Sequence, residues 1–198
     1  MQLQFLGREF TQWPGLVMPL RAGTAQYQAL QQFVTECRQF SYHSVLDLGS
    51  GSGVLGISIA QGRPLVMVDT NPKAVELSAL NLCGDQGQAL LGSWFEPVTG
   101  QFDLIIANPP YGRAEDWDPQ LAEQWGIPRD SVVSEDQGMA GITEIMSQCR
   151  PYMAHKLCLI HSEDQSHEVN ALGWRYQLAI TSRSVCAGLA MTVYEKIG

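Results

Sequence analysis

Three glycines follow an acidic residue in the stretch Asp47-Leu-Gly49-Ser-Gly51-Ser-Gly53. The stretch comes after an apolar, strand-like run, and its glycines permit a tight turn and a close approach of backbone to a ligand. In α/β folds, a nucleotide-like cofactor binds at such a strand end. A second acidic residue, Asp69, ends the next apolar run, where its carboxylate can accept hydrogen bonds from both hydroxyls of a ribose. We therefore expect a binding site for a nucleotide-like cofactor.

The same glycines fit two kinds of cofactor. Residues 51–56 match the G-x-G-x-x-G pattern of dinucleotide-binding turns, and Asp69 follows at a suitable distance. A dinucleotide, however, places an anionic pyrophosphate on this turn. S-adenosylmethionine (SAM) carries a cationic sulfonium and an ammonium group instead, which Asp47 attracts, whereas it repels a phosphate. The turn therefore favours SAM, with a dinucleotide as the alternative.

A rigid polar segment, Asn108-Pro109-Pro110-Tyr111, follows the third apolar run. Consecutive prolines hold the backbone extended, so the carbonyl and amide groups of this segment point in fixed directions. Our hypothesis is that the side-chain oxygen of Asn108 and the carbonyl of Pro109 accept the two hydrogens of a planar NH2 group, while Tyr111 packs on its plane. These bonds would orient a weak nitrogen nucleophile toward the methyl group of SAM. The order of these segments predicts a SAM-dependent N-methyltransferase that requires no metal.

Strands and helices alternate along the chain and must position these residues. Continuous apolar runs predict buried strands at 44–48, 64–69, 102–108 and 155–161. Helical spacing predicts helices at 24–39, 54–60, 71–81, 138–150 and 163–171, with Thr24 as the N-cap of the first. Two β-like runs follow at 174–182 and 188–196, and a long loop spans 111–137. The pattern predicts an α/β fold: a Rossmann-like, mostly parallel sheet with helices on both faces and a C-terminal antiparallel hairpin.

The length of the chain predicts the number of domains, and its net charge bears on the kind of partner. The chain has 198 residues, so we expect a single domain, with an N-terminal extension and helix at 1–43 and the Rossmann-like core at 44–198. Twelve basic and twenty acidic residues give a net charge of −8. An acidic chain does not favour nucleic acid as a partner, because binding to phosphates depends on basic contacts.

Cysteine spacing and hydropathy indicate the compartment. The five cysteines are widely spaced and form no C-x-x-C pair, which argues against a disulfide framework or a zinc site. No long apolar stretch predicts a membrane span, and the N-terminus does not match a secretory signal. We expect a cytoplasmic protein with buried thiols and no membrane association.

The order DLGSGSG, VDTNPKA and FDLIIANPPY resembles class I SAM-dependent methyltransferases that act on a planar nitrogen. The stretch 92–111 is similar to the HemK-like protein-glutamine N5-methyltransferases, which modify peptide-chain release factors. The segment IPRDSVVSEDQGMAGITEIM, at 127–146, follows the layout of the same family. The resemblance covers about residues 18–196.

This resemblance implies further cofactor contacts. Thr70 follows the acidic residue expected at the ribose, and Ser93 and Trp94 would lie near the adenine. The family commonly has an acidic residue at the position of Ser93, and packing in the core is the alternative for Trp94. The family also has an upstream P-R-P-x-T-E segment that contributes to the cofactor site. This chain matches it only at Pro19 and Thr24, so the resemblance implies a cofactor contact at Thr24.

The resemblance also implies partners. Bacterial members carry an N-terminal helical domain that docks the release factor, whereas the short eukaryotic and archaeal members, which this chain resembles in length, work with a small zinc-binding activator. The expected substrate is a glutamine in a release-factor-like protein. The alternative acceptor is the exocyclic amine of adenine in RNA or DNA, because the segment at 108–111 suits either planar NH2 group. A dinucleotide-dependent oxidoreductase and a non-catalytic binding module are the alternatives from other classes.

Overall fold

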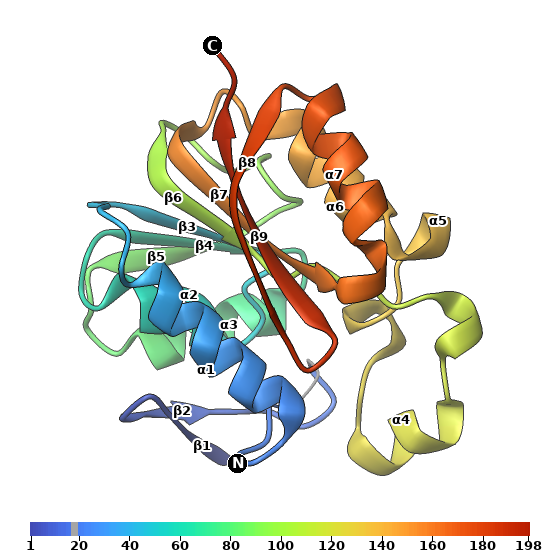
Figure 1. Cartoon of the computed structure of the whole chain (residues 1–198). Helices are drawn as coiled ribbons and strands as arrows, with labels where there is room; N and C mark the ends of the chain where they lie inside the picture. The colour runs from blue at the N-terminus through green and yellow to red at the C-terminus, as the bar shows by residue number, and fades with distance from the viewer. Residues whose placement is uncertain (17–19) are drawn as a thin grey trace.

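A seven-stranded sheet in the order β5-β4-β3-β6-β7-β9-β8 forms the centre of the molecule (Figure 1). The structure is a computed structural model that describes residues 1–16 and 20–198, so the predicted match at Pro19 lies outside the described residues. Five strands pair in parallel, namely β3 (Val45–Leu48), β4 (Leu65–Asp69), β5 (Gly87–Leu91), β6 (Phe102–Ala107) and β7 (Met153–Ser162). β9 (Leu189–Lys196) pairs antiparallel with β7 and with β8 (Leu178–Cys186).

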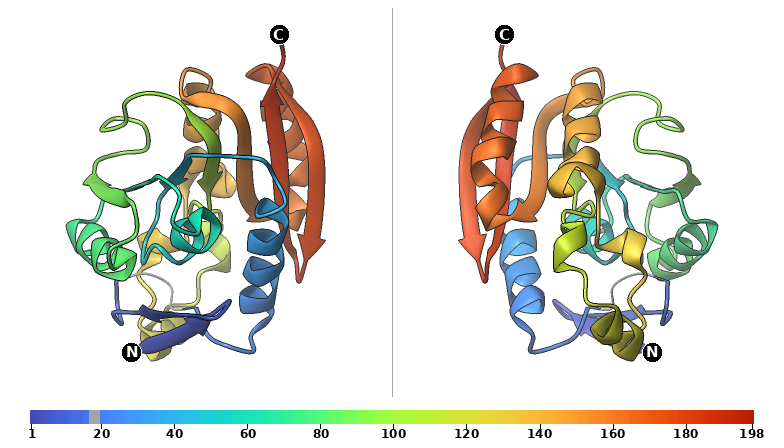
Figure 2. Two further views of the ribbon diagram at one scale, coloured as in Figure 1. Left: turned by 90° about the vertical axis from the view of Figure 1, so that its left-hand side faces the viewer. Right: turned by 90° about the vertical axis from the view of Figure 1, so that its right-hand side faces the viewer.

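Helices cover both faces of this sheet (Figure 2). One layer contains α1 (Ala25–Cys37), α2 (Val54–Ala60) and α3 (Pro72–Leu82), and the other contains α6 (Ala140–Gln148) and α7 (Ser166–Arg175). Side chains of β3 alternate between the two cores, with Val45 on the α1 side and Leu46 on the α6 side. Burial on both faces explains why the central strands are continuous apolar runs. In the described part of the chain, no helix is long and apolar enough to cross a bilayer.

Local signals set the helix starts that the sequence predicts. The side-chain oxygen of Thr24 accepts a hydrogen bond from the Tyr27 backbone N–H at 3.2 Å and caps α1. Asn71 caps α3 in the same way through the Lys73 N–H at 3.0 Å, and Pro72 occupies the first turn. Such caps satisfy backbone N–H groups that have no partner inside the helix. The predicted N-cap at Thr24 is confirmed.

The predicted fold class is confirmed, and helix 54–60 has the predicted bounds. The β-like run predicted at 174–182 starts too early, because α7 continues to Arg175 and β8 begins only at Leu178. The prediction of helix 138–150 also starts early, because Gly138 has a left-handed backbone with φ of 85° and α6 begins only at Ala140. The edge strand β5 was not expected.

A small N-terminal hairpin, β1 (Gln2–Phe5) and β2 (Arg8–Thr11), lies outside the main sheet. It adds to the extension and helix predicted before residue 44. Arg8 forms an ion pair with Asp85 after α3. The buried amide of Asn81 bonds to Thr11 through both of its polar atoms, at 2.8 and 2.9 Å. Its nitrogen also donates to the Ser52 carbonyl at 2.8 Å, so this one side chain joins the hairpin to the glycine turn.

The long connection after β6 contains short helices rather than an open loop. It includes α4 (Pro119–Trp125), α5 (Glu135–Gly138) and two 3₁₀ turns, at Ala114–Asp116 and Arg129–Ser131. Its second half folds back on the segment that follows β6. The Gly112 N–H donates to the Val132 carbonyl at 2.7 Å, and the Gly112 carbonyl accepts from the Ser134 N–H at 3.0 Å. A Cβ at position 112 would lie 2.8 Å from the Val132 oxygen, so this pairing requires glycine.

Candidate active site

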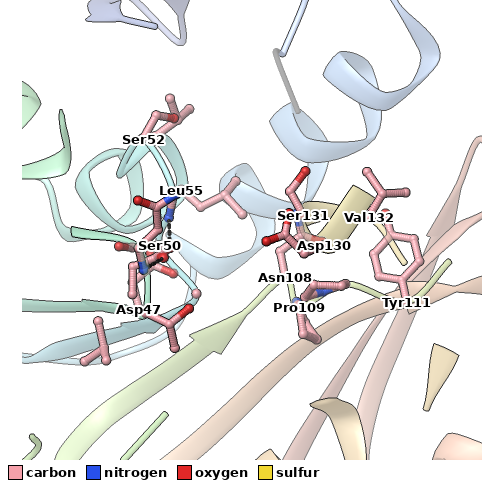
Figure 3. Close-up of a pocket in the computed structure, with 18 of the residues that line it drawn as sticks. Asp47, Ser50, Ser52, Leu55, Asn108, Pro109, Tyr111, Asp130, Ser131 and Val132 are labelled. Carbon is pink, nitrogen blue, oxygen red and sulfur yellow. Dashed lines mark hydrogen bonds between the residues drawn. The ribbon is translucent and has the colours of Figure 1, made fainter. Parts of the chain in front are cut away.

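A cavity of about 620 Å³ opens at the carboxyl ends of β3, β4 and β6 (Figure 3). The predicted residues that line it are Asp47, Gly49, Gly51, Asp69, Thr70, Ser93, Trp94, Asn108, Pro109, Pro110 and Tyr111. Thr24 and Gly53 are not among its lining residues. Thr24 caps α1 at the surface, and a side chain at Gly53 would meet Ile57 and Met67 under the turn. The cofactor contacts predicted at these two positions are therefore not part of the cavity.

Asp69 is fixed by the backbone around it. One carboxylate oxygen accepts from the Gly51 N–H and the other from the Asn71 N–H, each at 2.9 Å. Burial raises the pKa of Asp69, while these hydrogen bonds act in the opposite direction. The carboxylate thus ties the end of β4 to the glycine turn after β3. It keeps lone pairs that can accept hydroxyl groups from a ligand.

Asp47 is almost fully buried under the glycine turn, with 2% of its surface exposed. It accepts a hydrogen bond from the Gly56 N–H at 3.0 Å. A Cβ on Gly56 would lie 2.6 Å from the Asp47 carboxylate, so glycine is required there. Burial raises the pKa of Asp47 to about 7. The third glycine of the apparent dinucleotide pattern therefore makes room for a carboxylate of the protein itself, a role that the sequence analysis missed.

Trp94 forms a wall between the two predicted halves of the site. Its ring nitrogen donates to a carboxylate oxygen of Glu144 on α6 at 2.9 Å. Its backbone is in the left-handed region, with φ of 43°, which is uncommon for a bulky residue. Added side chains at Gly49 and Gly141 would meet the ring at 3.5 and 3.3 Å. Trp94 is therefore half-buried between the glycine turn and α6, where it lines the cavity and also packs against the core on the α6 side.

The amide of Asn108 faces the cavity with a buried oxygen, Oδ1, that has no hydrogen-bond partner in the described structure. The hydroxyl of Ser50 in the glycine turn is also buried and unpartnered. A buried polar atom without a partner costs about 1–3 kcal/mol, so a ligand that donates to Asn108 removes this cost. These two atoms point to a polar ligand between the glycine turn and the segment at 108–111.

The backbone carbonyl of Tyr111 is held by Gln165, which the sequence analysis did not single out. The side-chain nitrogen of Gln165 donates to the Tyr111 carbonyl at 2.9 Å and to the Gln137 carbonyl at 3.1 Å. Burial raises the pKa of Tyr111 to about 12, so its hydroxyl is protonated at neutral pH. Gln165, which directly precedes α7, thus joins the predicted acceptor segment to α5.

A further part of the wall comes from residues 130–132, which the sequence analysis also missed. Asp130, Ser131 and Val132 line the cavity and lie beside Asn108 and Tyr111 (Figure 3). They reach this place because the backbone of Gly112 pairs with Val132. The only signal in the sequence was the similarity of segment 127–146 to the family layout, which assigns no role to these side chains.

The charged side chains described in the cavity lining are all acidic. Three carboxylates line it, Asp47, Asp69 and Asp130, and no Lys, Arg or His appears among its described lining residues. Such a site attracts a cation and repels a pyrophosphate. Over the described residues, no three His, Cys, Asp or Glu side chains are grouped to hold a metal ion. The residues present therefore fit SAM better than a dinucleotide.

Comparisons with known proteins give matches to one family description and to individual relatives. The family description of the methyltransferase small domain matches residues 19–125. A release factor glutamine methyltransferase of Salmonella typhimurium is 35% identical over 139 residues, covering 65% of this chain and 50% of the relative. A release factor glutamine methyltransferase of Yersinia pestis is 37% identical over 136 residues, covering 65% and 49%. The chain thus spans about half the length of these relatives.

The fold itself is also found among solved structures. A methyltransferase from Pyrococcus furiosus superposes with a TM-score of 0.67 at 11% identity, and the match covers 92% of this chain and 89% of the other. The family match, unlike this likeness of fold, extends over more than half of the sequence and includes the glycine turn, Asp69 and the segment at 108–111. The chain therefore belongs to the methyltransferase small domain family.

Proposed function

We propose that this protein is a SAM-dependent N-methyltransferase whose acceptor is the side-chain amide of a glutamine in a release-factor-like protein. The observation that carries the proposal is the buried, unpartnered Oδ1 of Asn108 at a cavity lined by carboxylates. An amide NH2 group is the kind of donor that this oxygen lacks.

The cofactor side of the cavity suits SAM. Asp69 would accept the ribose hydroxyls, Asp47 would favour the positive charge of the ligand, and Trp94 would cover its adenine. When bound, SAM supplies an electrophilic methyl group on a positively charged sulfur. The protein contributes orientation and electrostatics, because the reactivity belongs to the cofactor.

On the acceptor side, the amide nitrogen needs help because its lone pair is delocalised into the carbonyl group. Asn108 Oδ1 and the Pro109 carbonyl would accept hydrogen bonds from the two N–H groups of the amide and so fix the direction of its lone pair. The same two oxygens would stabilise positive charge as it develops on the nitrogen. Correct positioning alone can supply roughly 7–11 kcal/mol of the barrier.

A protein acceptor fits the charge of the site better than a nucleic acid. The cavity lining offers carboxylates and no basic side chain among its described residues, whereas nucleic acids require basic contacts to phosphate. The similarity to release factor glutamine methyltransferases supports the same choice. The five cysteines are unpaired, which is consistent with a cytoplasmic protein in a reducing compartment.

The proposal is tested by transfer of radiolabelled methyl groups from SAM. Release factor, tRNA, rRNA and duplex DNA are offered separately, with the Asn108→Ala variant as the control protein. We expect label in the release factor, mapped by mass spectrometry to one glutamine, and almost none with the variant. Label found only in nucleic acid would replace the acceptor by adenine. A parallel reaction with added cell extract tests whether a small activator protein is needed.

A further inference from the structure

Asp130 is the third carboxylate of the cavity, and its charge also acts on Asp69 on the cofactor side. It lies beside Asn108 and across from Asp47 (Figure 3). The pairing of Gly112 with Val132, at 2.7 Å, fixes the segment of Asp130 to the residue that directly follows the acceptor segment. Asp130 and Asn108 are therefore held on the same wall by backbone contacts, although 22 residues separate them in sequence.

Methylation of an amide leaves a proton to be removed. When the nitrogen lone pair forms a bond to the methyl carbon, the C–S bond breaks and its electron pair stays on sulfur. The nitrogen then carries a positive charge and two hydrogens, one of which must leave to restore a neutral amide. The oxygens of Asn108 and Pro109 accept hydrogen bonds, but neutral carbonyl oxygens are very weak bases and cannot retain the proton.

The other ionisable side chains described in the cavity lining are not available to accept this proton. Asp47 and Asp69 are bonded to backbone N–H groups on the cofactor side. The Tyr111 hydroxyl already carries its proton at neutral pH, because burial raises its pKa to about 12. Among the described lining residues, Asp130 is the carboxylate that remains, and its exposure to solvent lets it pass a proton on to water.

We propose that Asp130 is a catalytic residue that faces the reacting nitrogen, stabilises its positive charge and accepts its proton as the N–H bond breaks. The electron pair of that bond stays on nitrogen, and the proton moves from the Asp130 carboxylate to water. The inference rests on the proposed function, since it assigns the proton acceptor for that same reaction.

Turnover provides the first test. Asp130→Asn keeps the shape of the side chain and removes its charge, so kcat for a glutamine acceptor should fall by about 10²-fold, the lower end of the usual effect of a general base. Asp116→Asn and Asp136→Asn are matched controls, because both carboxylates are exposed on the same connection but do not line the cavity. Both controls should keep the wild-type kcat, and all three variants should keep the wild-type Tm.

Equilibrium binding provides a second test that does not depend on turnover. Sinefungin carries an amine where SAM carries the transferable methyl group, whereas S-adenosylhomocysteine is neutral at sulfur. Titration calorimetry should show that Asp130→Asn binds sinefungin several-fold more weakly than the wild type while its affinity for S-adenosylhomocysteine is unchanged. An equal loss for both ligands, or no loss for either, would overturn the position assigned to Asp130.

The two proposals fail in different ways. A wild-type protein that labels no glutamine substrate overturns the proposed function. A wild type that is active on glutamine, beside an Asp130→Asn variant with the same kcat, overturns only the role of Asp130.

Discussion

The two sides of the cavity differ in how their carboxylate and amide groups are bonded. On the cofactor side, Asp47 and Asp69 both accept hydrogen bonds from backbone N–H groups. On the acceptor side, Oδ1 of Asn108 has no partner in the described structure, and Asp130 is exposed. The carboxylates of the cofactor side are therefore fixed before any ligand arrives, although the Ser50 hydroxyl of the glycine turn is unpartnered, whereas we expect the substrate to complete the acceptor side. Substitutions on the first side should change cofactor binding, and substitutions on the second should change turnover.

The strongest test of this difference is Asn108→Ala. Loss of one oriented polar group at the reacting nitrogen should lower the rate of methyl transfer by about 10²-fold or more. Affinity for SAM, measured by calorimetry, should stay within a few-fold of wild type, because the variant leaves Asp69 and the glycine turn intact. Turnover close to the wild-type rate would remove the acceptor role of this segment.

Asp69→Ala should have the opposite pattern. Hydrogen bonds to a charged group contribute about 1.5–3 kcal/mol, so affinity for SAM should fall roughly 10- to 100-fold. At saturating SAM, kcat should change little. Glu76→Ala, at a site outside the cavity lining, is a matched control that should bind SAM like the wild type. If Asp69→Ala binds SAM with unchanged affinity, the ribose assignment is wrong.

Gly56→Ala tests whether the cofactor side depends on close packing. The new methyl group would lie 2.6 Å from the Asp47 carboxylate, and overpacking of this kind costs about 1–3 kcal/mol. We expect a lower free energy of unfolding in urea and weaker binding of SAM.

The Asp47→Ala/Gly56→Ala double variant provides the control for that prediction. It removes the group with which the new methyl clashes, so the two losses of stability should not add. Additive losses would show that the cost of Gly56→Ala has another origin.

The pH dependence of stability is the smallest expected effect. Burial raises the pKa of Asp47 from 3.8 to about 7, so the protonated carboxyl binds its proton more tightly in the folded chain than in the unfolded one. The resulting stabilisation is fully present below about pH 4 and is lost as the pH rises through about 7. Between about pH 5 and pH 8, Tm of the ligand-free protein should therefore fall more steeply than Tm of Asp47→Asn.

Adding SAM sharpens this pH prediction, because a cation favours the ionised form of Asp47. Bound SAM should make the Tm of the wild type less dependent on pH across the same range. The Asp116→Asn variant should follow the wild type with and without SAM. Equal slopes for wild type and Asp47→Asn would contradict the assignment to this residue.

The parts of the fold that could be predicted are those with local signals. The buried strands β3, β4 and β6 are continuous apolar runs, and α3 begins at Asn71 and Pro72, which fix its first turn. β5 could not be found in this way, because an edge strand with mostly exposed or half-buried residues has no apolar run. β1 alternates polar and apolar residues, but over only four positions with two buried side chains, and this short signal was not singled out in the sequence.

The same distinction applies to the site. Asp47 and Asp69 lie in the last residues of β3 and β4, Asn108 directly follows β6, and the carboxyl ends of such parallel strands meet at one edge. Asp130 follows no strand and reaches the cavity through the backbone pairing of Gly112 with Val132. No spacing rule predicts that pairing. The prediction of Thr24 in the cofactor site rested on resemblance alone, and its local role as an N-cap is the one the geometry supports.

The amide of Asn81 couples the N-terminal hairpin to the glycine turn. Its hydrogen bonds to Thr11 and Ser52 connect two segments that lie 41 residues apart along the chain. A protein that binds β1 and β2 and displaces them must either break the hydrogen bond between Asn81 and Ser52 or move the glycine turn as well. A displacement of the hairpin is thus transmitted to the glycine turn that lines the proposed cofactor site.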